Sequence, residues 1–407
     1  TTGGDGSIVI TGGLRGVLDG QRSSDYYDPF ISKFNQEGEK QWTTVLQFSP
    51  EASWPDSYMG HTYDVGNDVT TGNDGSIYVT GSKNSNSNAF IYKLNSDGIE
   101  QWSKLLGSSG HIQGTRITTG IDGSIYIAGY TIGDLDGQEN SGEKDIFISK
   151  FNSAGDKQWT SLLGSSSNEI ASGITTSNDG SIYITGDTKG DLDGQKKSGD
   201  TDAFISKFNP DGSKEWTKLL GNTESTDQSI SNFNFERHTN SSSITTGSDG
   251  SIYICGSTNG DLDGQKKSGD RDAFISKFNP DGSKEWTKLL GSDLEHVYTS
   301  NNASGAITNG NDGSLYVSIL VNHWEHYISK YDKNGNIQWS EHLGINDRSV
   351  FSGITTGKDG SLYIYTSGVS QNEPSKVFIS KFIETLAPED LSISQTSFDE
   401  NIEANSV

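Results

Sequence analysis

Three copies of one acidic loop hold the residues of this sequence with the clearest potential for chemistry. The pentapeptide Asp-Leu-Asp-Gly-Gln occurs at residues 134–138, 191–195 and 261–265, and further Asp residues follow each copy. Carboxylates on one side of a sharp turn, closed over by a later one, suit calcium, which takes roughly six to eight oxygen ligands. The sequence therefore predicts calcium as a cofactor, with ligands drawn from Asp134, Asp136, Gln138, Asp145, Asp191, Asp193, Gln195, Asp202, Asp261, Asp263, Gln265 and Asp272.

A structural explanation of these loops stays open. Asp and Gly are ordinary turn formers, and the spacing is not that of an EF-hand loop. An earlier copy keeps Asp19, Gln21 and Asp28 but has Val17 at the first Asp position, so we expect it to bind calcium weakly or not at all.

Histidine, arginine and tyrosine residues in predicted loops form a second candidate site. Such groups could supply acid–base chemistry for a polysaccharide lyase or a glycoside hydrolase. The candidates are His111, His238, His296, Arg116 and Tyr63. No ligand spacing recurs among the histidines, and no phosphate loop, nucleophile elbow or zinc-protease motif is present. The sequence thus favours a non-catalytic protein and keeps an enzyme as the alternative.

The elements that must position these residues repeat seven times. Asp-Gly-Ser followed by an apolar run begins at Asp5, Asp74, Asp122, Asp179, Asp249, Asp312 and Asp359. The fullest unit reads "ITTSNDGSIYITG", a variable loop, then "DAFISKFNPDGSKEWTKLLG". Alternating apolar residues between tight-turn sequences predict four short strands per unit, called a, b, c and d. Seven such units predict an all-β fold, a seven-bladed β-propeller of four-stranded blades over residues 1–383.

Strand polarity sorts the connections of such a ring onto two faces. The constant a–b and c–d turns share the bottom face, and the variable b–c loops and d–a connections share the top face, where function is usually carried. Residues 190–221 and 260–291 are identical except for Thr201 against Arg271. Copying a blade preserves the contacts between blades, so this duplication is compatible with folding.

A tryptophan recurs on strand d, at Trp42, Trp102, Trp159, Trp216, Trp286 and Trp339. Its fixed place in the repeat favours a buried aromatic layer between blades over a sugar-stacking array. The pattern "ITTSNDGSIYITG…DAFISKFNPDGSKEW" resembles the SBBP repeat, a β-propeller repeat of bacterial extracellular proteins. That resemblance implies a scaffold within large secreted or surface proteins rather than one chemistry.

Composition narrows the possible partners. The chain has 407 residues, with 54 acidic and 30 basic side chains and a net charge of −24. This charge disfavours nucleic acid and anionic membranes, and no apolar run is long enough to span a bilayer. The lone Cys255 excludes an intramolecular disulfide and a cysteine metal cluster.

The ends of the chain suggest a longer protein. Blade 7 lacks a tryptophan strand, which we expect from upstream residues or, as the alternative, from residues 391–398. Beyond Phe382, the segment "LSISQTSFDENIEANSV" resembles the start of a cadherin-like or related immunoglobulin-type tandem domain. The resemblance implies that residues 384–407 are a linker and the start of a following domain. We therefore expect a secreted or cell-surface adhesion module that presents its top loops to an extracellular glycan or a matrix protein.

Overall fold

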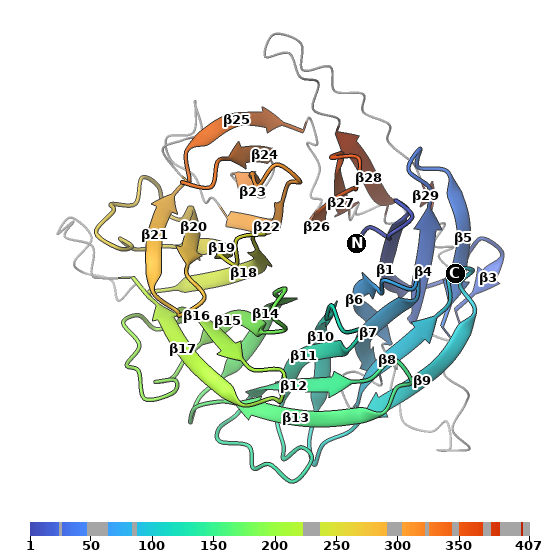
Figure 1. Cartoon of the computed structure of the whole chain (residues 1–407), viewed down its shortest axis with the longest axis horizontal. Helices are drawn as coiled ribbons and strands as arrows, with labels where there is room; N and C mark the ends of the chain where they lie inside the picture. The colour runs from blue at the N-terminus through green and yellow to red at the C-terminus, as the bar shows by residue number, and fades with distance from the viewer. Residues whose placement is uncertain are drawn as a thin grey trace.

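The computed structural model describes residues 1–23, 27–46, 64–83, 88–222, 237–290, 303–321, 325–343, 350–368, 376–382 and 400–401. These residues form 29 strands and no helix, so none of them belongs to a helix that could cross a membrane. The strands pair antiparallel in seven sheets that stand as blades around one axis and in one further two-stranded hairpin (Figure 1). The predicted seven-bladed β-propeller is confirmed.

Each blade runs outward from the axis, from strand a to strand d. Blade 1 contains β1 (Ile8–Leu14), β4 (Asp28–Phe34) and β5 (Lys40–Val45), with a small hairpin of β2 (Val17–Leu18) and β3 (Gln21–Arg22). Blades 2 to 4 are β6 (Val65–Thr71), β7 (Ile77–Lys83), β8 (Asn88–Leu94) and β9 (Glu100–Leu106); β10 (Ile112–Thr119), β11 (Ile125–Thr131), β12 (Asp145–Phe151) and β13 (Lys157–Leu163); and β14 (Glu169–Thr176), β15 (Ile182–Thr188), β16 (Asp202–Phe208) and β17 (Lys214–Leu220). Blades 5 to 7 are β18 (Thr239–Thr246), β19 (Ile252–Thr258), β20 (Asp272–Phe278) and β21 (Lys284–Leu289); β22 (Ala303–Asn309), β23 (Leu315–Val321), β24 (Glu325–Tyr331) and β25 (Ile337–His342); and β26 (Val350–Thr356), β27 (Leu362–Gly368), β28 (Lys376–Phe382) and β29 (Glu400–Asn401).

The first and last blades are completed by the two ends of the chain. Thr2 pairs with Ile8 at the inner position of blade 1. At the outer position of blade 7, β29 pairs with the first residues of β28. The outer strand thus comes from residues just beyond the 391–398 segment, whereas we expected upstream residues. The rest of the predicted linker and following domain lies outside the described residues.

A closed ring of hydrogen bonds joins the inner strands. The last residue of strand a in each blade donates a side-chain hydrogen to the backbone carbonyl of the equivalent residue in the preceding blade, at 2.7–3.2 Å. The donors are Thr2, Thr71, Thr119, Thr176, Thr246, Asn309 and Thr356. The last Thr of the repeated "ITT" therefore ties neighbouring blades together around the axis.

The hydrophobic core lies between blades rather than at the axis. Ile146 and Ile148 of blade 3 pack against Ile182, Ile184 and Phe204 of blade 4, all fully buried. Because a β-strand alternates its side chains, each sheet offers one apolar face to each neighbour. This packing holds the loops on both faces in fixed positions.

The strand-d tryptophans make contacts between blades, as predicted, but they are half-buried rather than buried. The Trp159 indole donates to the carbonyl of Pro210, in the c–d turn of blade 4, at 3.1 Å. It also covers Gly212, where an added Cβ would lie 2.7 Å from the ring. Gly212 has a φ of 87°, a conformation that favours glycine.

Candidate functional site

Each Asp-Leu-Asp-Gly-Gln segment is a tight turn anchored by its leucine. In blade 3, Leu135 and Gln138 exchange backbone hydrogen bonds of 3.1 and 3.0 Å. Between them, Asp136 and Gly137 have positive φ angles of 52° and 79°, as a type I′ turn requires. The Leu135 side chain is only 2% exposed and joins the core between blades 2 and 3.

The Gln and the second Asp of the loop bind the outer strand of the same blade. The Gln138 amide donates to the carbonyl of Thr160, and its oxygen accepts from the backbone N–H of Leu162 at 3.1 Å. Asp136 accepts from the ammonium of Lys157 and from the Thr160 hydroxyl. These side chains occupy the edge of β13 where another strand would pair, so they protect that edge.

The same contacts recur in the other copies. The Gln residues donate to the carbonyls of Thr43, Thr217 and Thr287, and the Asp residues pair with Lys40, Lys214 and Lys284. Blade 1 makes them although it has Val17 at the first Asp position. The edge contacts therefore do not depend on the complete acidic motif.

Two other predicted ligands of blade 3, Asp134 and Asp145, bind backbone N–H groups. Asp134 accepts from Asn140 at 3.0 Å, and Asp145 accepts from Ser141 at 2.7 Å. Burial raises the pKa of Asp145. Burial also opposes ionisation of Asp136, but hydrogen bonds from Lys157 and Thr160 outweigh it and lower the pKa of that carboxyl.

Within each blade, the predicted calcium ligands thus lie in the b–c loop or at the start of strand c, and they bind different groups of the protein. Across the described ranges, no three His, Cys, Asp or Glu side chains come together in a way that could hold a metal ion. An ion at Asp136 would compete with Lys157. Calcium binding remains a prediction from sequence, and the contacts give these carboxylates a structural role.

The three predicted catalytic residues that the structure describes, His111, Arg116 and His238, do not share one site. His111 is exposed at the start of blade 3. The Arg116 guanidinium, on β10, donates to the carbonyl of Ser172 in blade 4 at 2.6 Å, a contact between inner strands. His296 and Tyr63 lie outside the described residues. Of the three described residues, His238 lines a pocket, and the other two are not among its lining residues.

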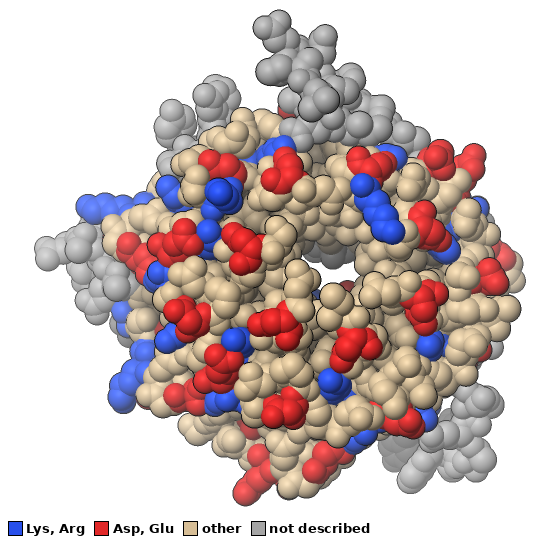
Figure 2. Space-filling model, in the orientation of Figure 1, with Lys and Arg blue, Asp and Glu red and all other residues tan. Residues whose placement is uncertain are grey.

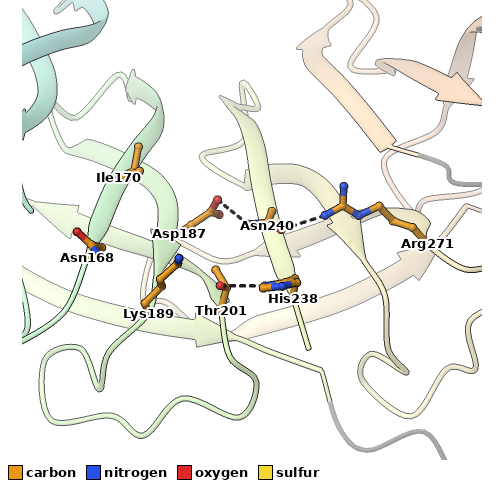
Figure 3. Close-up of a pocket in the computed structure, with 8 residues that line it drawn as sticks. All are labelled: Asn168, Ile170, Asp187, Lys189, Thr201, His238, Asn240 and Arg271. Carbon is orange, nitrogen blue, oxygen red and sulfur yellow. Dashed lines mark hydrogen bonds between the residues drawn. The ribbon is translucent and has the colours of Figure 1, made fainter. Parts of the chain in front are cut away.

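That pocket lies on the top face between blades 4 and 5 and has a volume of about 340 Å³ (Figure 3). Its volume falls within the range of small-molecule sites, roughly 300–1,000 Å³. Loops and strand ends of both blades form the wall, namely Asn168, Ile170, Asp187, Lys189 and Thr201 from blade 4 and its entry, and His238, Asn240 and Arg271 from blade 5. Connections of both kinds predicted for the top face thus meet here.

A chain of hydrogen bonds crosses the boundary between the two blades. The Asn240 amide donates to the Asp187 carboxylate at 2.7 Å and accepts from the Arg271 guanidinium at 3.3 Å (Figure 3). The other Asp187 oxygen accepts from the backbone N–H of Ser241 at 2.8 Å. Burial raises the pKa of Asp187 to about 6, although these hydrogen bonds and Arg271 act to lower it.

His238 directly precedes β18 and lies beside Thr201 in the pocket (Figure 3). Its backbone N–H donates to the side-chain oxygen of Asn259 at 2.8 Å, and its Nδ1 lies 3.0 Å from the Thr201 hydroxyl. Thr201 is only 4% exposed, so its contact with His238 fixes the position of the imidazole in the pocket wall.

Sequence reasoning found His238 but missed Asp187, Lys189 and Asn240. One signal was available for Asp187, because its place on strand b is taken by Ser82, Tyr130 and Ser257 in blades 2, 3 and 5. A carboxylate at that position departs from the repeat.

Residues 101–136 and 158–193 match the family model of the SBBP beta-propeller repeat. These two segments are similar to SBBP repeats. They run from strand d of blades 2 and 3 into the acidic loops of blades 3 and 4. The resemblance inferred from the repeated strands is confirmed there, whereas the cadherin-like resemblance of the last residues remains a prediction.

The regulatory protein FlaEY of Caulobacter vibrioides is 27% identical over 188 residues, which make up 44% of this chain and 18% of FlaEY. Among solved structures, a PL25 ulvan lyase aligns with a TM-score of 0.48 at 12% identity, over 76% of this chain and 78% of the lyase. A puromycin hydrolase aligns with a TM-score of 0.50 at 9% identity, over 94% of this chain and 51% of the hydrolase. Structural likeness at such low identity shows the fold alone.

Proposed function

We propose that the protein is a non-catalytic binding module, secreted or displayed at the cell surface within a larger protein, whose top face binds a glycan between blades 4 and 5. The pocket carries this proposal. Its wall offers amide, carboxylate, hydroxyl, imidazole, ammonium and guanidinium groups, which can donate to or accept from sugar hydroxyls. Ile170, 41% exposed, adds an apolar surface for the C–H face of a sugar ring.

Several residues that line the pocket lie on strands, which favours ligand binding without a large conformational change. Asp187 lies on β15 and Asn240 on β18, and the strands beneath them pack into one buried core. Polar groups held on strands are preorganised, which reduces the entropic cost of binding. On the face that Figure 2 shows, acidic and basic side chains are interspersed around a hollow at the axis of the ring.

A polysaccharide lyase or glycoside hydrolase is the second candidate, and one observation favours it. Asp187, whose pKa burial raises to about 6, lies in the same pocket as His238, and a carboxyl group with such a pKa can transfer protons. The same pocket would then be the active site.

One experiment separates the two candidates. The protein is incubated with acidic and neutral polysaccharides while calorimetry measures binding and an end-group assay measures new reducing or unsaturated ends. We expect heat of binding without new ends. New ends that disappear in both Asp187→Asn and His238→Ala would establish the enzyme and overturn the non-catalytic proposal. No heat of binding with any polysaccharide would exclude a glycan ligand.

A calcium site in the acidic loops is the alternative to the structural role that their contacts give these carboxylates. An ion there would replace the lysine partners of Asp136, Asp193 and Asp263 and would act on stability, since these loops contribute no lining residue between Asp191 and Gln195 or between Asp261 and Gln265.

A further inference from the structure

The one position at which the duplicated blocks differ contributes twice to the same pocket. Thr201 and Arg271 each precede strand c of their blade, β16 and β20. Because blades 4 and 5 are neighbours, the two side chains line the same pocket from different blades (Figure 3). The sequence difference between the copies is thus concentrated in the candidate site.

The residue before strand c has a different role in each of three blades. In blade 3 it is Lys144, whose ammonium lies 4.2 Å from the centre of the Tyr130 ring. In blade 4 it is Thr201, buried against His238. In blade 5 it is Arg271, half-buried in the pocket wall. Of these three residues, only Arg271 presents a cation to the pocket.

The hydrogen-bonding groups left for a ligand are mainly cationic donors. Arginine has five N–H donors, and within the described chain Arg271 donates one of them, at 3.3 Å, to Asn240. The exposed Lys189 ammonium has no hydrogen bond or ion pair to the residues that the structure describes, and it reaches in from blade 4 (Figure 3).

The acidic groups at and beside the pocket already have partners. Both oxygens of Asp187 accept hydrogen bonds, from Asn240 and from Ser241. Asp200, behind His238, accepts from the backbone N–H of Arg237 at 2.7 Å. Glu143 accepts from Asn168 at 2.5 Å. A ligand therefore meets engaged acceptors and available cations, which favours an anion.

From these contacts we infer that the pocket selects acidic saccharides and that Arg271 determines this selectivity, by donating paired N–H groups to a carboxylate or sulfate on the sugar. The guanidinium fork matches the geometry of such groups, which a lone ammonium does not. The inference rests on the proposed function, because it names the class of glycan that the same pocket takes.

The natural difference between blades 4 and 5 suggests the variant for the test. Arg271→Thr gives blade 5 the residue that blade 4 carries in an otherwise identical block, so the fold should persist, as an unchanged melting temperature will verify. Arg271→Lys keeps the charge but removes the fork. Both variants and the wild type are applied to an array of carboxylated, sulfated and neutral oligosaccharides, and calorimetry with the strongest acidic and neutral ligands gives the affinities.

We expect the wild type to prefer a carboxylated or a sulfated oligosaccharide, and the array distinguishes these two sources of charge. Arg271→Thr should weaken binding of the acidic ligand by about tenfold or more, because a charge-assisted hydrogen bond is lost. The affinity of Arg271→Lys for that ligand should lie between those of the wild type and Arg271→Thr. Equal binding of acidic and neutral sugars, or a preference that Arg271→Thr leaves intact, would overturn the inference but not the proposed function. If no oligosaccharide on the array binds, both are wrong.

Discussion

The Asp187 carboxylate of blade 4 accepts a hydrogen bond of 2.7 Å from the Asn240 side chain of blade 5. This contact joins two blades at the wall of the pocket, 53 residues apart in the sequence. Burial raises the pKa of Asp187 to about 6 from the ordinary 3.8, so the folded state binds the proton more tightly than the unfolded chain. The proton's contribution to stability is therefore complete below pH 3.8 and lost as the pH rises through 6.

Asp187→Asn should remove this pH dependence. A shift of about two pKa units corresponds to roughly 2–3 kcal/mol, so the stability of the variant relative to the wild type should rise by up to that amount between pH 4 and about pH 7. Urea unfolding of both proteins at the two pH values measures the difference. A relative stability that does not change with pH would show that Asp187 titrates normally.

Gln138 should stabilise blade 3 by protecting the edge of β13. Gln138→Ala removes one hydrogen bond to Thr160 and one from Leu162, so we expect a loss of about 1–3 kcal/mol in the free energy of unfolding and faster exchange of the Leu162 amide hydrogen. The neighbouring Glu139 is exposed, and Glu139→Ala should change stability by less than about 0.5 kcal/mol. Equal effects of the two variants would contradict the edge-protecting role.

The ring of hydrogen bonds around the axis should respond to a near-isosteric change. Thr176→Val removes the donor to the carbonyl of Thr119, 3.0 Å away, and should cost about 1 kcal/mol in the free energy of unfolding. Its neighbour Thr175 has no side-chain hydrogen bond to the described residues, so Thr175→Val is the matched control. Chemical denaturation compares the two, and a control as destabilised as Thr176→Val would assign the loss to β14 in general.

A calcium titration decides the role of the acidic loops. Because Asp193 and Asp263 already pair with Lys214 and Lys284, we expect millimolar calcium to change the melting temperature no more than magnesium at equal ionic strength. A rise specific to calcium that is lost in the double variant Asp193→Ala with Asp263→Ala would instead establish the ion site predicted from sequence, since a ligand that binds the folded state raises its stability.

The blades could be predicted from sequence because their determinants are local. The turn at Asp136 and Gly137 needs two residues that tolerate positive φ, and "DG" between apolar residues is a strong local signal for it. Strand alternation and the recurring tryptophan gave the order of the strands in the same way.

The partners of the polar side chains could not be predicted in that way. Asp136 meets Lys157 across 21 positions, and the pairing depends on how the loop folds over β13. The pocket depends on contacts between two particular blades, whereas a repeat pattern shows only the features that all blades share. Arg271 is the single difference in the duplicated block, but its place in the same pocket as Thr201 follows only from the closed ring of blades.

The most direct test of the central claim is the position of a bound saccharide. A crystal of the protein is soaked with the oligosaccharide that binds most tightly. The account predicts electron density between blades 4 and 5, with a carboxylate or sulfate at Arg271 and sugar hydroxyls near Asn240 and His238. Density over the axis or on the bottom face, with the pocket between blades 4 and 5 free of sugar, would contradict it.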